Sequence, residues 1–164
     1  MPGYAADLPD NCGMTDVHFY FNVPDKLALA CRLARKAFMQ GAPMVLTANA
    51  AQLGQLDEML WQMAPSDFLA HDYVAEQQAA TAQAPIQLRE AIAANSLMHS
   101  SARSARLLLT LWEEVPAAFS HFERVYELVS AHDQADREQA RKRWRFYQQR
   151  GYAIHRHDLA QKGG

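Results

Sequence analysis

Hydrophobic and polar residues alternate near the start of the chain, and the pattern then changes to helical spacing. The segment VHFYFN from Val17 puts every second side chain on one face, which predicts a strand that ends before Pro24. Asp25 is suited to cap a helix that ends at Gly41, with apolar residues at helical spacing at Leu27, Cys31, Ala34 and Phe38. Residues 44–48 (MVLTA) form a continuous apolar run, typical of a strand buried on both faces. These three elements predict a βαβ unit with a right-handed crossover.

Similar patterns continue through the rest of the chain. Residues 50–63 predict a second helix, with a core-facing stripe at Leu56, Met59, Leu60 and Met63. Strands are predicted at 86–88 and 106–112, and 122–129 fits a strand or a helix, with a strand favoured. A last helix is predicted over 133–150 and an edge strand over 152–155, while the polar stretches 75–85 and 93–104 are expected to be mobile loops. This alternation predicts a three-layer α/β domain with a largely parallel sheet.

The chain has the size of a single domain. It contains 164 residues, of which 49% are hydrophobic and 21% charged, enough apolar material for a core and too little charge for disorder. We expect residues 1–13 to be a disordered extension, residues 14–158 to form the domain and residues 159–164 to be a flexible tail. No apolar run could span a bilayer and no secretory signal is recognised, so we expect a cytoplasmic protein without membrane contact.

The sequence lacks the motifs of common nucleotide and metal enzymes. The first predicted strand leaves through residues 22–25 without a glycine, and no GxxxxGK[ST] motif occurs, so we expect no nucleotide-binding loop. The histidines are scattered apart from the pair His155 and His157, for which a structural role is favoured over metal binding. Cys12 and Cys31 can form at most one disulfide and no zinc site of their own. We therefore expect no cofactor, no metal and no catalytic site.

Charge is segregated along the chain, although the net charge is only −2. Residues 137–164 contain eight Lys or Arg against two acids, a net charge of +6, whereas the first 136 residues carry −8. This asymmetry predicts a basic patch for an anionic partner, either nucleic acid or an acidic peptide. An ordinary solvated helix face is the alternative explanation.

The basic residues of the last predicted helix share one face. Arg137, Arg141 and Arg145 recur at four-residue spacing, and Trp144 lies between this face and the buried side marked by Ala140. Arginine binds a carboxylate with a bidentate fork, and an aromatic ring can form the wall of an apolar pocket. A peptide that ends in an apolar residue with a free carboxylate would fit such a face. A solvated helix with Trp144 packed inward explains the pattern equally well.

A second candidate surface lies on the predicted helix 50–63. Trp61 falls on the side opposite the core stripe, and Phe68 follows shortly after the helix. Buried aromatic side chains contribute much of the energy of protein interfaces, so this surface is a candidate for a protein partner. The alternative is that the segment after Pro65 folds back and covers Trp61.

Several segments, taken in order, are similar to one known family. The segments that carry the resemblance are VHFYFN, the helix ending at Gly41, MVLTA, LDEMLW with Phe68 and His71 after it, RVYELV, and RxxxRKRWRFYQQRGY at 137–152. From about Thr15 to His155, the chain resembles the chi subunit of bacterial DNA polymerase III. The resemblance implies a bacterial source and a Rossmann-like α/β fold without a nucleotide site. It also implies a non-enzymatic subunit that links the clamp-loader complex, through the psi subunit, to the acidic C-terminal tail of single-stranded DNA-binding protein.

The resemblance also implies which residues would bind each partner. The site for the acidic tail would comprise Val129, Arg137, Arg141, Trp144 and Arg145. Trp61 and Phe68 match positions that the family uses to bind psi, and a helicase is a further candidate partner for that surface. DNA would be contacted only indirectly.

Three classes of function can be weighed on these observations. A non-enzymatic adaptor is favoured. Direct nucleic-acid binding by the basic helix is the alternative, but the charge of −8 on the rest of the chain opposes it. An enzyme is least favoured, because no nucleophile, metal cluster or phosphate loop is recognised.

Overall fold

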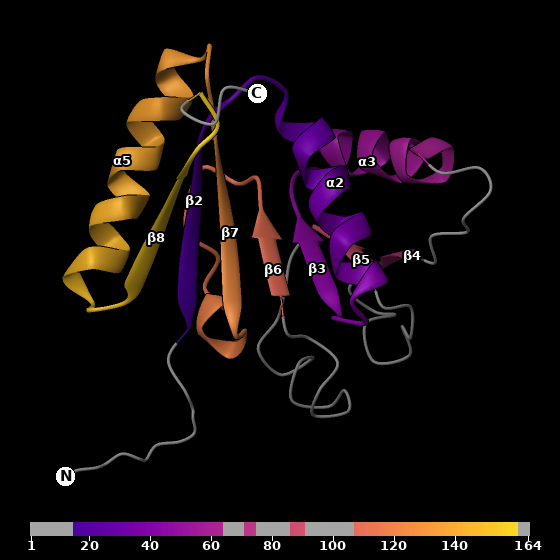
Figure 1. The fold of residues 1–164 in the computed structure, drawn as a ribbon, viewed down its shortest axis with the longest axis horizontal. Coiled ribbons are helices and arrows are strands. Elements are labelled where there is room, and N and C mark those ends of the chain that lie inside the picture. The colour runs from indigo at the N-terminus through magenta and orange to yellow at the C-terminus, as the bar shows by residue number, and fades with distance from the viewer. Residues whose placement is uncertain (1–14, 64–70, 75–85, 91–106, 161–164) are drawn as a thin grey trace, which may run out of the picture.

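A seven-stranded sheet forms the middle layer of the protein in a computed structural model that describes residues 15–63, 71–74, 86–90 and 107–160 (Figure 1). The strand order is β4-β5-β3-β6-β7-β2-β8, and all neighbouring strands are parallel. The strands are β2 (Asp16–Val23), β3 (Met44–Thr47), β4 (His71–Val74), β5 (Ile86–Arg89), β6 (Leu107–Thr110), β7 (Arg124–Ser130) and β8 (Ala153–Asp158). The helices are α2 (Lys26–Met39), α3 (Ala50–Met63), α5 (Gln134–Gln149) and the short 3-10 helix η2 (Phe119–His121). The predicted α/β fold with a largely parallel sheet is confirmed.

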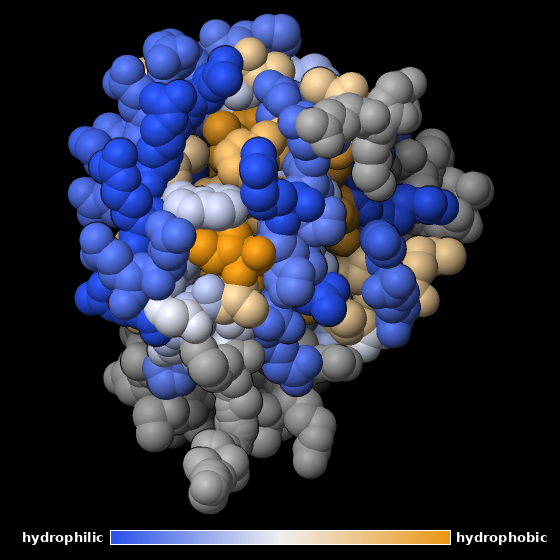
Figure 2. Space-filling model, turned by 60° about the vertical axis from the view of Figure 1, so that its left-hand side comes forward, coloured by the Kyte–Doolittle hydropathy of each residue, from blue (hydrophilic) through white to orange (hydrophobic). Residues whose placement is uncertain are grey.

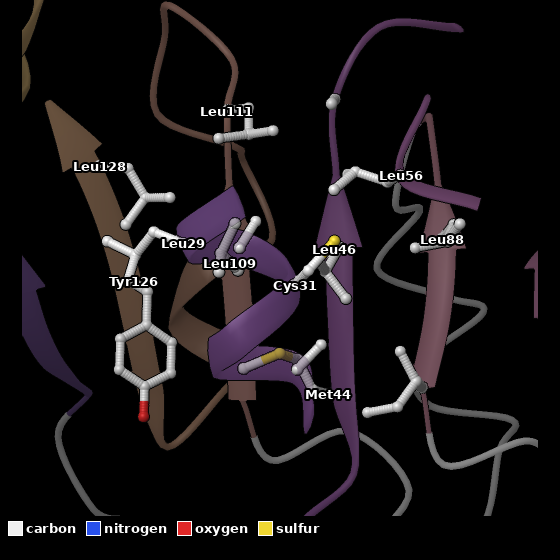
Figure 3. Close-up of a cluster of buried hydrophobic side chains, with 14 of the residues drawn as sticks. Leu29, Cys31, Met44, Leu46, Leu56, Leu88, Leu109, Leu111, Tyr126 and Leu128 are labelled. Carbon is white, nitrogen blue, oxygen red and sulfur yellow. The ribbon is translucent and has the colours of Figure 1, made fainter. Parts of the chain in front are cut away.

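The helices cover opposite faces of the sheet. α2 and α3 pack on one face, where Leu29, Leu46 and Leu56 belong to the same buried cluster (Figure 3). α5 packs on the other face, where Tyr147 and Val45 belong to a second cluster. Successive residues of a strand point to opposite faces, so β3 contributes Leu46 to one cluster and Val45 to the other. This double burial explains the continuous apolar run of β3.

The two longest predicted helices begin and end where the sequence indicates. The Asp25 side chain accepts a hydrogen bond from the backbone N–H of Ala28 at 3.1 Å, and Asp133 caps α5 in the same way. Gly41 and Gly151 follow α2 and α5 with φ of 71° and 80°, in the left-handed region that favours glycine. α5 therefore has a fixed start and a fixed end on its face of the sheet.

Other details differ from the sequence-based expectations. The strands of the predicted βαβ unit, β2 and β3, are parallel but are separated by β7 and β6. β4 was not predicted, and the buried stripe of α3 consists of Leu53, Leu56 and Leu60, with Met59 only half-buried. The side chain of Met63 lies outside the description.

The expected extension at 1–13, with Cys12, and the two predicted loops at 75–85 and 93–104 lie outside the described residues. Cys31 is a buried free thiol in the cluster under α2. No helix in the described parts of the chain is long and apolar enough to cross a bilayer.

Candidate functional site

A groove runs between α5 and the strands β2, β7 and β8. Its volume is about 430 Å³. Its lining comprises Phe21, Val129, Arg137, Ala140, Arg141, Trp144, Arg145, Gln148 and Arg156. Figure 2, which brings this side of the molecule forward, shows apolar side chains at the base of a hollow with hydrophilic side chains on both sides. All five residues that the resemblance assigns to tail binding therefore line one groove.

Trp144 belongs to both the core and the groove. Its ring lies 5.0 Å from the ring of Phe19 and 5.9 Å from that of Phe21, measured between centroids, and its side chain is half-buried. The two explanations considered for Trp144, inward packing and a groove wall, therefore hold together. Because one side of the indole ring packs on β2, the wall it forms has a fixed position.

The base of the groove is apolar and its edge is cationic. Val129 and Ala140 are buried, whereas Arg137, Arg141 and Arg145 are exposed on α5. The exposed guanidinium groups retain water contact, so a carboxylate can reach them without the large penalty of burying an unpaired charge. An apolar side chain next to a carboxylate matches this combination.

One arginine of the basic segment serves a different purpose. Arg143 is 4% exposed, and its Nε donates to Oε1 of Glu127 at 2.7 Å, while its Nη1 donates to the carbonyl oxygen of Glu113 at 2.8 Å. The Tyr147 hydroxyl donates to the other oxygen of Glu127, also at 2.7 Å. This buried network joins α5 to β7 and so holds the groove wall against the sheet.

Sequence reasoning missed this network, although a signal was present. Arg143 lies three residues after Ala140 and four before Tyr147, so helical spacing puts it on the buried side of α5. Glu127 likewise interrupts an apolar strand sequence. Burial raises the pKa of the Glu127 carboxyl above its ordinary value, while the neighbouring Arg143 and the Tyr147 hydrogen bond act in the opposite direction.

The first turn of α5 is also bonded to the start of α2 and to the end of β7. The carboxylate of Asp136 accepts from Nζ of Lys26 at 2.9 Å and from the backbone N–H of Ser130 at 2.8 Å. Lys26 begins α2 and Ser130 ends β7. These contacts fix the first turn of α5, from which Arg137 projects into the groove.

Trp61 lies on the solvent side of α3, as the helical pattern predicts. Its side chain is 53% exposed, while Leu56 and Leu60 on the other side of the helix are buried. Met39, at the end of α2, is the other large hydrophobic residue exposed in the described chain, and it is not among the residues predicted to form a partner surface. Phe68 lies outside the described residues.

A larger cleft of about 810 Å³ lies at the carboxyl ends of β3 and β6, where nucleotides bind in many parallel α/β sheets. Among the described residues that line it, the charged ones are one base, Lys26, and five acids: Glu90, Glu113, Glu114, Asp133 and Asp136. The single base is already paired with Asp136. Negative charge dominates this cleft and disfavours a phosphate group.

Three histidines meet on the sheet face opposite the groove. β8 lies beside β2 in parallel register, which brings His155 and His157 against His18. Nδ1 of His18 and Nε2 of His157 are 2.8 Å apart, and the His18 and His155 rings stack at 4.6 Å. Burial, then the charges of Arg124, His155 and His157, lower the pKa of His18 to about 4. Among the described residues no cluster of His, Cys, Asp and Glu has an arrangement that could hold a metal ion.

Comparison with known proteins assigns the chain to a family. A family sequence model described as "DNA polymerase III chi subunit, HolC" matches residues 14–155. The chain belongs to the DNA polymerase III chi subunit family. The chi subunit of Pseudomonas aeruginosa is 36% identical over 152 residues, which cover 89% of this chain and 98% of that protein. The chi subunit of Haemophilus influenzae is 29% identical over 128 residues, covering 77% and 82% respectively.

Membership of the chi family confirms the resemblance found in the sequence. The matched span, residues 14–155, agrees with the expected span from Thr15 to His155 and includes α3 and α5. Trp61 and the groove-lining residues other than Arg156 therefore lie within the part of the chain that the family model matches.

Proposed function

We propose that this chi-family chain is a non-enzymatic adaptor that joins two partners of DNA polymerase III. The groove beside α5 binds the acidic C-terminal tail of single-stranded DNA-binding protein, and the surface of α3 around Trp61 binds the psi subunit, with Phe68 assigned to the same partner by the family resemblance alone. The partner identities come from the family, and the chemistry of the two surfaces supports them. DNA is then reached through its binding protein.

The observation that carries the tail assignment is the shared lining of the groove. Val129 and Trp144 provide an apolar base and wall, while Arg137, Arg141 and Arg145 provide cations along one edge. A peptide terminus has an apolar side chain and a carboxylate on the same Cα, so both can be satisfied at once. Bidentate pairing of arginine with a carboxylate adds direction to the charge attraction.

The psi assignment is supported by the exposure of Trp61. Trp61 is 53% exposed although the opposite side of its helix packs in the core, so a large aromatic ring is accessible to a partner. Aromatic side chains of this kind are the residues that contribute most when an interface covers them. Trp61 and the groove are on different helices, α3 and α5, which pack on opposite faces of the sheet.

The tail proposal is tested with three labelled peptides of equal net charge. The first ends in an apolar residue with a free carboxylate, the second is its C-terminal amide with one extra upstream Asp, and the third lacks the last apolar residue. We expect only the first to bind tightly, and Arg141→Ala to weaken it about 10- to 100-fold. Equal binding of all three peptides would show that diffuse charge alone operates.

A labelled single-stranded oligonucleotide, titrated in parallel, tests the alternative function. The proposal expects weak binding that disappears at moderate salt, because the phosphate backbone would meet only a few arginines. Oligonucleotide binding tighter than that of the free-acid peptide would replace the adaptor role with direct nucleic-acid binding.

A further inference from the structure

The groove has a second cationic edge that the α5 pattern does not contain. Arg156 lies on β8, in register with Phe19 of β2, and its side chain is exposed along the groove. Its guanidinium carbon lies 5.4 Å from the centroid of the Phe21 ring. A guanidinium at this distance from an aromatic face is attracted by the ring, which favours its position at the groove edge.

The alternation of β8 explains why Arg156 reaches the groove. His155 and His157 stack on His18 on one face of the sheet, so Arg156 between them points to the face that carries α5. Arg141 and Arg156 therefore come from two different elements, α5 and β8, and line the same groove over the apolar base formed by Phe21 and its neighbours.

We propose that Arg156 is a further specificity-determining residue of the groove and binds the terminal carboxylate of the acidic peptide together with Arg141. This inference rests on the proposed tail-binding function. The terminal side chain and the terminal carboxylate share one Cα, so a side chain seated on Phe21 and Trp144 places the carboxylate beside the guanidinium that lies over Phe21. Arg137, one helical turn before Arg141, is left for the acidic residues upstream.

Charge alone does not define this role, because every arginine near the groove attracts an acidic peptide. A residue that contacts the carboxylate differs in one respect: its contribution disappears when the carboxylate is converted to an amide. The interaction between a protein substitution and a peptide modification is measured by a double-mutant cycle.

The experiment combines Arg156→Gln with the free-acid and amidated peptides of equal net charge. We expect Arg156→Gln to weaken the free-acid peptide about 10-fold, as for a hydrogen bond to a charged group, and to change binding of the amide less than about 2-fold. An equal loss on both peptides would overturn the carboxylate contact. The thermal unfolding midpoint of the variant is measured alongside, and the exposed side chain predicts little change.

Arg150→Gln is the matched control. Arg150 also lies over an aromatic ring, with its guanidinium carbon 3.9 Å from the centroid of Phe146, but it does not line the groove. Its substitution removes the same charge and is expected to weaken the free-acid peptide less than about 2-fold. An equal loss of affinity for Arg150→Gln and Arg156→Gln would show that Arg156 contributes only through its charge, and would overturn the inference.

The outcomes separate this inference from the proposed function. If the unsubstituted protein does not distinguish the free acid from the amide, the tail-binding function itself fails. If it does distinguish them and Arg156→Gln distinguishes them equally well, tail binding stands and the role of Arg156 is refuted.

Discussion

The same substitution at two arginines of α5, two residues apart, is expected to lower stability at one position and peptide affinity at the other. Arg143 is buried and paired with Glu127, whereas Arg141 is exposed in the groove. Arg143→Met should therefore lower the free energy of unfolding, and Arg141→Met should lower the affinity for the acidic peptide. Methionine suits both positions because it keeps helix propensity and an unbranched stem of similar length.

The magnitude for Arg143 follows from what its removal leaves behind. Glu127 is 0% exposed and, among its hydrogen bonds to described residues, would keep only the one from Tyr147. Breaking a buried ion pair by removing one partner costs about 3 to 5 kcal/mol, because the other charge stays desolvated. That is a large part of the roughly 5 to 15 kcal/mol that stabilises a typical domain.

The pH adds a second signature. Burial already raises the pKa of Glu127. Without Arg143, taking up a proton is the way in which this carboxyl group lowers the free-energy cost of its own desolvation. The folded state then binds more protons than the unfolded state, so the loss of stability should be larger at pH 8 than at pH 5.

Urea unfolding of the full chain measures both variants, and titration with the free-acid peptide measures the affinity of the folded fraction. Arg141→Met should change the free energy of unfolding by less than about 0.5 kcal/mol while weakening the peptide at least about 10-fold. The double variant Glu127→Leu, Arg143→Met removes both charges and should be more stable than Arg143→Met alone. A loss under about 1 kcal/mol for Arg143→Met, or no recovery in the double variant, would refute the reasoning.

Three further predictions concern other parts of the molecule. Trp61→Ala should weaken psi binding in calorimetry by about 2 kcal/mol or more without lowering the unfolding midpoint, and a lowered midpoint would indicate a core role instead. Calorimetry should detect no saturable ATP or NAD binding, because the cleft at the strand ends is acidic; saturation would contradict this. The free energy of unfolding should fall by about 1 kcal/mol between pH 6.5 and 4, because the pKa of His18 is lowered to about 4 in the folded state and the unfolded state binds the proton first. His18→Gln should reduce that slope, and an unchanged slope would assign it to other groups.

Local signals predicted where α2 and α5 begin and end, one helix on each face of the sheet. The caps at Asp25 and Asp133 and the glycines at 41 and 151 act within a few residues of themselves, so they can be recognised without knowing the fold. β4 could not be recognised in this way. Its sequence, HDYV, is four residues long and begins with two polar side chains, His71 and Asp72, which gives no clear strand period.

The helix period grouped three arginines on one face of α5 but did not show which basic residues of the helix are buried. It placed Arg137, Arg141 and Arg145 together, and in the structure these three residues line one groove. It did not show what lies opposite, and so could not decide whether Arg143 would meet water or a carboxylate. The answer depends on Glu127, sixteen residues earlier on a strand that only the folded sheet brings under α5.

The order of the strands in the sheet could not be predicted from local sequence patterns. β8 was predicted as an edge strand, but its neighbour, β2, lies more than a hundred residues away along the chain. That one pairing brings His155 and His157 to His18 on one face of the sheet and Arg156 to the groove on the other. A substitution in β8 therefore acts on a site that helical periodicity assigns to α5 alone. For this reason the peptide affinity of Arg156→Gln, rather than that of any α5 variant, tests whether both α5 and β8 contact the peptide in the groove.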